Sequence, residues 1–165
     1  MQNSSSISFG TTTQTLKVGS SATVTISGPI YLDSPNFPAW TQYTYNAGDF
    51  TGAGSMTWTV ATASVANISY AIAGKWMAIT IGVIQSSVGG TVASSLQFTI
   101  PGGKLSKTRA DGTCIVTDNG TVGLGRIGCN IPSSSVIVFQ KPDGSNFITS
   151  TTNTSVRGFL LFEIQ

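Results

Sequence analysis

The stretch from Gly54 to Pro101 constrains the fold most, because its apolar residues recur at a period of two, which is the period of a β-strand. It contains four runs of this kind, at residues 56–62, 67–73, 75–85 and 95–100. In the third run, one face carries Met77, Ile79, Ile81 and Val83, and the other carries Trp76, Ala78, Thr80 and Ile84. Neither face is polar, so this strand is predicted to lie in the middle of a sandwich or at a subunit contact.

The last apolar run, residues 156–164, also has two dry faces. One face is expected to meet the opposing sheet, and the other is a candidate for a subunit interface. The residues proposed for this interface are Trp76, Phe159 and Leu161. Together these runs predict an all-β protein that folds as an antiparallel β-sandwich.

The low charge of the chain supports the idea that the protein associates. Only 8% of its 165 residues are charged, against about 25% in a typical domain. The formal net charge of +2 provides little repulsion between molecules. We therefore expect much of the surface to be covered by copies of the same chain or by a partner.

Neither nucleic acid nor a membrane is an expected partner. The basic cluster of Lys104, Lys107 and Arg109 lies in a predicted loop beside Asp111, with no aromatic residues interleaved. The apolar run at 68–84 is too short for a membrane span and contains a lysine, so it predicts two strands.

The residue inventory argues against an enzyme and against a bound cofactor or metal. The chain contains no histidine, which excludes Ser-His-Asp triads and histidine metal sites. Its carboxylates lie mostly beside Gly, Pro or Asn in predicted turns; they are Asp33, Asp49, Asp111, Asp118, Asp143 and Glu163. A polysaccharide depolymerase would need two of them within roughly 5–9.5 Å, in one protomer or across a subunit seam, and this is the remaining enzymatic alternative.

A hairpin is predicted across residues 112–131, with Asn119-Gly120 forming a type I′ turn. This turn places Cys114 opposite Gly125, so Cys114 and Cys129 are predicted to be buried thiols and not a disulfide. The segment 123–128 matches GxGxxG, but it runs into Asn130-Ile131-Pro132, where no helix can start. Its glycines therefore indicate a closely packed strand or bulge and not a nucleotide site.

The N-terminal residues 1–36 are expected to form an arm and a linker ahead of a domain at 37–165. The arm has no apolar core of the kind found in a secretory signal. Its two spaced apolar residues, Ile7 and Phe9, are predicted to dock onto a neighbouring subunit or surface; packing along its own domain is the alternative. A short strand is predicted at 21–27, followed by a proline-rich connection at 28–38.

Three aromatic residues stand where the chain enters the domain, namely Trp40, Tyr43 and Tyr45. They could form a platform on which sugar rings stack. We favour the alternative that they attach the entering chain to the edge of the sandwich, because no acidic or amide groups crowd beside them in the sequence.

Several short motifs, in this order, give the chain a resemblance to a known class of protein. They are FPAW at 37–40, SMTWTV at 55–60, Tyr70-x-x-x-Gly74-Lys75-x-Met77, Leu96-x-Phe98-Thr99-x-Pro101, DNGT at 118–121, and Gly158-x-x-x-Phe162-Glu163-Ile164. Their order and spacing resemble the trimeric β-sandwich knob modules of tailed-bacteriophage virion proteins. The resemblance covers residues 37–165 and implies a jelly-roll-like protomer, three-fold assembly and a structural or adhesive role. It implies no active-site residue.

The expected function follows from this resemblance. A knob with a short arm and no shaft repeat suits a homotrimeric capsid decoration (cement) protein, made in the host cytoplasm and placed on the capsid surface of the virion. Its expected partners are its own copies and the major capsid protein. The alternative is a tail-fibre tip that recognises a host surface glycan through loops such as 143–153.

Overall fold

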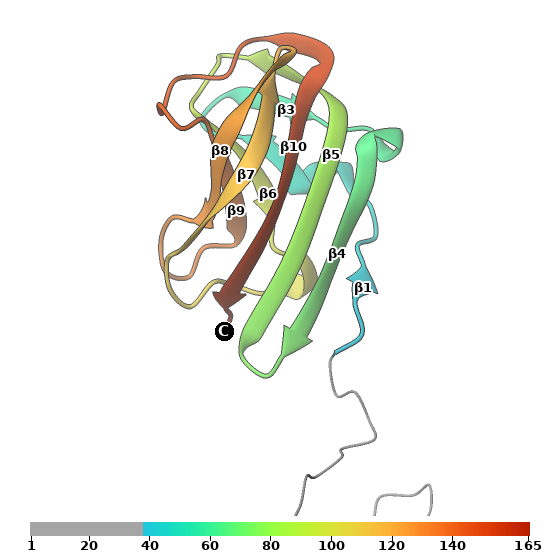
Figure 1. The fold of residues 1–165 in the computed structure, drawn as a ribbon, viewed down its shortest axis with the longest axis vertical. Coiled ribbons are helices and arrows are strands. Elements are labelled where there is room, and N and C mark those ends of the chain that lie inside the picture. The colour runs from blue at the N-terminus through green and yellow to red at the C-terminus, as the bar shows by residue number, and fades with distance from the viewer. Residues whose placement is uncertain (1–37) are drawn as a thin grey trace, which may run out of the picture. The chain divides into compact units, whose positions relative to one another are not determined.

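The computed structural model describes residues 38–165, which belong to a compact unit of Asn36–Gln165. The described chain contains ten strands and three short 3-10 helices, with no α-helix among these residues (Figure 1). All of its strand pairs are antiparallel, so the predicted all-β, antiparallel fold is confirmed. The docking residues Ile7 and Phe9 and the strand predicted at 21–27 lie outside the described residues.

The bounds of the elements follow the chain in order. The strands are β1 Thr41–Gln42, β2 Phe50–Gly52, β3 Met56–Thr59, β4 Val65–Ala73, β5 Trp76–Gly90, β6 Ser95–Thr99, β7 Ala110–Asp118, β8 Thr121–Cys129, β9 Val136–Gln140 and β10 Ser150–Glu163. The 3-10 helices are η1 Ala47–Asp49, η2 Thr62–Ser64 and η3 Pro101–Gly103.

The strands form one sheet that curls over itself, in the order β1-β4-β5-β10-β7-β8-β9-β6-β2, with β3 added on β5. Strand β5 causes much of the curl, because it pairs with β4 as far as Val83 and with β3 from Ser87 onward. Gln85, at this change of partner, has a positive φ of 52°, as expected for a bulge that bends a strand. Figure 1 shows β4, β5 and β10 as long neighbouring strands, with the β7–β8 hairpin on the side of β10 away from β5.

Side chains from both halves of the curled sheet fill the core. Of the two apolar faces predicted for β5, the one that carries Met77, Ile79, Ile81 and Val83 faces the core, since these residues are at most 1% exposed. An aromatic cluster closes the end of the core near β3. Its ring centroids lie 5.1 Å apart for Phe50 and Phe98, 5.4 Å apart for Phe50 and Trp58, and 6.0 Å apart for Trp58 and Phe139.

Two strands are longer than their sequence patterns predict. Strand β5 continues to Gly90, past the predicted end at 85, and β10 begins at Ser150, ahead of the predicted start at 156. Both extensions are polar in sequence, yet Ser86 and Thr154 are buried there. The bulges interrupt the alternation of apolar and polar residues, and a hydropathy pattern does not show that the hydroxyls are buried. Both strands were therefore predicted to be shorter than they are.

The predicted hairpin is confirmed as β7 and β8. Asn119 and Gly120 have φ values of 46° and 85°, as a type I′ turn requires. Cys114 lies opposite Gly125 in the ladder, and both cysteines are buried free thiols as predicted. A Cβ on Gly125 would lie 2.5 Å from Val116 Cγ2, and one on Gly128 would lie closer still to the Ala110 carbonyl oxygen, which confirms close packing at these two glycines. Gly123 differs, because a Cβ there would meet no atom within 4 Å.

The prediction that the carboxylates lie mostly in turns was wrong for Asp111 and Asp118, which belong to β7. Glu163 lies at the end of β10, within the last strand predicted from the sequence. Asp118 is buried and accepts hydrogen bonds from Lys141 Nζ at 2.9 Å and from the backbone N–H of Ile148 at 3.0 Å. Each strand position brings the carboxylate next to a cation or donor distant in sequence, which a local pattern does not reveal.

Candidate functional site

The sheet formed by β4, β5, β10, β7 and β8 has one face turned away from the core. Directly opposed residues in an antiparallel pair point to the same side of the sheet. Phe159 lies opposite Thr80, and Leu161 lies opposite Ala78. Arg157, which points to the same side of β10 as Phe159 and Leu161, lies opposite Ile115 on β7. We call this side of the sheet the outer face.

Exposed apolar side chains are concentrated on the outer face. Nine large apolar side chains are exposed among residues 38–165, and seven of them lie on this face. The seven are Trp40, Trp76, Ile115, Val122, Leu124, Phe159 and Leu161, with exposed fractions from 46% to 68%. The three aromatic members alone, at about half of ~150–250 Å² each, present on the order of 300 Å². Contiguous apolar patches above a few hundred Å² mark interaction sites on soluble proteins.

The structure places the predicted interface residues together on this face. Trp76 lies opposite Glu163, two residues along β10 from Leu161, which is followed by Phe159 on the same side. Their exposed fractions are 52%, 53% and 54% for Trp76, Phe159 and Leu161. They therefore form one patch across β5 and β10 and are available for contact.

Four members of the outer face were not predicted. Ile115, Val122 and Leu124 lie on the β7–β8 hairpin, where glycine and threonine dilute the apolar pattern. The alternation of inward Cys114 with outward Ile115 is the signal that would have identified this face. Trp40 lies before β1, outside any apolar run with a period of two, so the sequence did not place it on this face.

A groove marks the end of the outer face near β1. It has a volume of about 460 Å³ and is lined by Pro38, Trp40, Ala71, Ala73, Trp76, Ala78 and Leu161. The alanines make a shallow floor between two indole rings, so another chain can approach the sheet closely there. No charged side chain lines it.

Ion pairs border the apolar part of the outer face. Asp111 accepts from Arg109 Nε at 2.9 Å and from Arg126 Nε at 2.6 Å. Partial burial opposes ionisation, but the Arg126 and Arg109 guanidinium groups outweigh it and lower the pKa of Asp111. Lys107 and Glu163 pair at 2.9 Å. An apolar centre with a polar rim is the usual anatomy of a protein interface.

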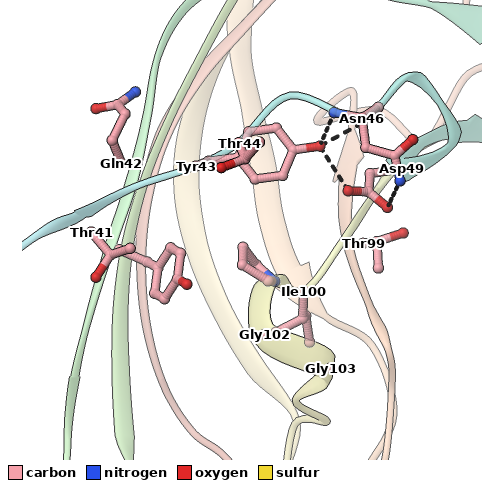
Figure 2. A pocket seen from close by; sticks show the side chains of 12 residues that line it. Thr41, Gln42, Tyr43, Thr44, Asn46, Asp49, Thr99, Ile100, Gly102 and Gly103 are labelled. Atoms are coloured by element: carbon pink, nitrogen blue, oxygen red, sulfur yellow. Dashed lines mark hydrogen bonds between the residues drawn. The ribbon is translucent and has the colours of Figure 1, made fainter.

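A second, more polar pocket lies between the chain entering the domain and the η3 turn (Figure 2). It has a volume of about 410 Å³ and is lined by Thr41, Gln42, Tyr43, Thr44, Asn46, Asp49, Tyr70, Thr99, Ile100, Pro101, Gly102 and Gly103. Figure 2 shows the hydroxyl of Tyr43 directed at Asn46 and Asp49, with Ile100, Gly102 and Gly103 below them. We call it the edge pocket.

Hydrogen bonds hold Tyr43 and Asp49 in fixed positions in the edge pocket. The Tyr43 hydroxyl donates to Asp49 Oδ2 at 2.7 Å and accepts from the backbone N–H of Asn46 at 3.0 Å. Burial and the bond to Asp49 raise the pKa of Tyr43 well above its usual range. The hydroxyl therefore stays protonated and remains a donor to the carboxylate.

The entering aromatic residues divide between two roles. Tyr43 packs edge-on against Phe98 at 5.2 Å, and the Tyr45 hydroxyl donates to the Val60 carbonyl at 2.6 Å. The preferred interpretation, attachment of the chain to the sandwich, is confirmed for these two tyrosines. Trp40 differs, because its ring lines the groove on the outer face.

The loop proposed for glycan recognition in the alternative function, 143–153, lies at the surface for most of its length. Asp143 accepts from the backbone N–H and the hydroxyl of Ser145, at 3.0 and 2.8 Å, which lowers the pKa of Asp143. Phe147 and Ser150 are the exceptions: the ring of Phe147 lies in the core, and Ser150 is also buried.

Within residues 38–165, no group of three or more Cys, Asp or Glu side chains is arranged to hold a metal ion. The same part of the chain has no helix of the length and apolarity needed to cross a bilayer.

Comparison with known proteins finds no relative. No protein-family model, no curated protein and no solved structure matches this chain.

Proposed function

We propose that this chain is a non-enzymatic structural protein that assembles into a homotrimer through its outer face. The observation that carries the proposal is that seven of the nine large apolar side chains exposed among residues 38–165 lie on that single face.

Copies of the same chain are the occupants that we propose for this face. The carboxylates at its border, Asp111 and Glu163, are paired within the protomer. Arg157 is the charged residue of the face that has no ion pair among residues 38–165, and the interface must solvate it or match it. A low net charge of +2 leaves little repulsion to keep copies apart. The number three comes from the resemblance to trimeric phage knob modules.

The same resemblance supports a location for the trimer on a phage particle. We propose that it is a decoration protein of a phage capsid that binds the major capsid protein and adds cohesion to the shell. Three modest contacts on one rigid trimer bind far more tightly than one. Once the first contact has formed, the second and third subunits are held close to their own sites at a high effective concentration. The predicted arm residues Ile7 and Phe9 remain the candidates for that contact.

The environments of the carboxylates support a non-enzymatic role. Asp111 is engaged by arginines, Asp118 by Lys141, and Glu163 by Lys107. Each is held by its own cation, whereas a glycosidase leaves two carboxyl groups facing one substrate.

The oligomeric state tests the proposed face directly. We expect light scattering after size exclusion to give three times the 17.1 kDa mass of the chain. Phe159→Asp should convert the trimer to a monomer without unfolding it, because the side chain is half exposed in the protomer. Ile131→Asp is the control, since Ile131 is 63% exposed but lies off the outer face. A monomeric wild type would overturn the proposal.

Electron cryo-microscopy of the particle tests the location. Trimeric density on the capsid surface would support the decoration function. Density at the tail tip would instead support the alternative, a knob that recognises a host surface glycan.

A further inference from the structure

The edge pocket is separate from the outer-face groove, and the two share no lining residue. We propose that the edge pocket binds a neutral sugar ring through the Asp49 carboxylate and the ring of Tyr70. This inference does not depend on the oligomeric state, and it places sugar contact away from loop 143–153.

The Asp49 carboxylate is positioned but not neutralised. Its Oδ2 accepts from Tyr43 at 2.7 Å and its Oδ1 accepts from Asn46 Nδ2 at 3.3 Å. Among the described residues, no lysine or arginine pairs with it. Two oxygens with about four acceptor sites leave capacity for further donors, and two adjacent sugar hydroxyls are donors of the right spacing.

Several other polar groups line the pocket without a side-chain partner in residues 38–165. They are the hydroxyls of Thr41, Thr44, Tyr70 and Thr99 and the amide of Gln42. Each can donate and accept, which matches the dual character of a sugar hydroxyl. A ligand rich in hydroxyls satisfies this set better than an apolar ligand.

The pocket also offers apolar surface and an open rim. Tyr70 packs partly against the core, and Ile100 and Pro101 are buried beside it. Aromatic rings present a flat apolar face, on which the C–H face of a sugar packs. At the rim, Gly102 and Gly103 have φ values of 72° and 64°, and a Cβ on Gly103 would meet no atom within 4 Å.

Charge and size narrow the class of ligand. Among residues 38–165, Asp49 is the only charged side chain that lines the pocket, so acidic sugars, phosphate and sulfate are repelled. A volume of about 410 Å³ lies within the range of small-molecule sites, roughly 300–1,000 Å³. A single carboxylate without a second one facing it binds a sugar but does not hydrolyse it.

The test is a titration of the full chain, followed by amide NMR, with the methyl glycosides of glucose, galactose, mannose, N-acetylglucosamine and N-acetylgalactosamine, and with their β-linked disaccharides. We expect at least one of these sugars to shift the amides of residues 41–49, 70 and 99–103. Asp49→Asn and Tyr70→Ala should each weaken binding by about tenfold or more. Tyr43→Phe should weaken it less, because it removes one bond that positions the carboxylate and keeps the ring.

Two controls separate this site from the others. Asp143→Asn removes an exposed carboxylate in loop 143–153, and Trp76→Ala removes an indole from the groove; both should bind the sugar as the wild type does. Unfolding curves should show that Asp49→Asn is folded. The proposal is overturned if no sugar of the set binds, or if the shifts fall on the groove or on loop 143–153. Because light scattering measures assembly separately, failure of this site and failure of the trimer are distinguishable.

Discussion

The indole N–H of Trp58 donates a 2.8 Å hydrogen bond to the hydroxyl of Ser86, across the pair formed by β3 and β5. Ser86 in turn donates to the carbonyl of Thr154 on β10 at 2.8 Å. A buried serine thus links three strands at the point where β5 has exchanged β4 for β3.

Ser86→Ala removes a single oxygen atom but should lower the stability of the fold considerably. The buried indole N–H and the Thr154 carbonyl would both lose a partner, and an unsatisfied buried group costs about 1–3 kcal/mol. We expect the free energy of unfolding in urea to fall by that amount. Ser135→Ala, at an exposed serine, is the control and should change it little. Equal stability of the two variants would contradict this role for Ser86.

Lys141 and Asp118 form the most buried ion pair of the described residues, with exposed side-chain fractions of 18% and 7%. Lys141→Met should leave the Asp118 carboxylate buried without its cation. Breaking a buried pair costs about 3–5 kcal/mol, and the residual exposure of Lys141 favours the lower end. Chemical denaturation measures the loss. Lys107→Met removes the partner of Glu163 from a more exposed pair and should cost much less.

The β7–β8 hairpin offers a matched pair of glycines for a test of packing. Gly125→Ala places a Cβ 2.5 Å from Val116 Cγ2 and 2.8 Å from the Gln140 carbonyl. Overpacking of this kind costs typically about 1–3 kcal/mol. Gly123→Ala, two residues earlier on the same strand, meets no atom within 4 Å and should be neutral or slightly stabilising. Thermal unfolding of both variants measures the difference. Equal midpoint temperatures would contradict this account of the packing.

The two buried cysteines predict a loss of stability at high pH. Burial raises the pKa of Cys114 and of Cys129 to about 11. In the unfolded chain both thiols ionise near pH 8.5, so the unfolded state releases protons first. The contribution of the two thiols to the free energy of unfolding should be constant below about pH 8 and fall as the pH rises from there toward 11. Urea titrations at several pH values measure this, and the variant with both cysteines changed to alanine should show a flatter profile.

The sequence predicted those parts of the fold that depend on local pattern. The inward face of β5 follows from strict alternation between Met77 and Val83, and the turn at Asn119-Gly120 follows from the need for positive φ. The ends of β5 and β10 could not be predicted in this way, because the polar residues Ser86 and Thr154 are buried there. Their hydroxyls are hydrogen-bonded inside the core, Ser86 to the carbonyl of Thr154 and Thr154 to the hydroxyl of Ser150.

The candidate sites were predictable to different degrees. Phe159 and Leu161 could be identified because their own strand shows two apolar faces. The edge pocket could not, since Asp49, Tyr70 and Thr99 are far apart in the chain and meet only through the pairing of β1 with β4 and of β2 with β6. No local spacing of residues encodes that meeting.

The three tryptophans of the chain occupy two different environments. Trp58 is 3% exposed and hydrogen-bonded in the core, whereas Trp40 and Trp76 are 51% and 52% exposed on the outer face. The molecule thus contains its own optical reporters: one indole whose emission follows unfolding, and two whose emission moves to shorter wavelength when the outer face is covered. Dilution of the native protein, followed by fluorescence alone, therefore separates dissociation from loss of the fold.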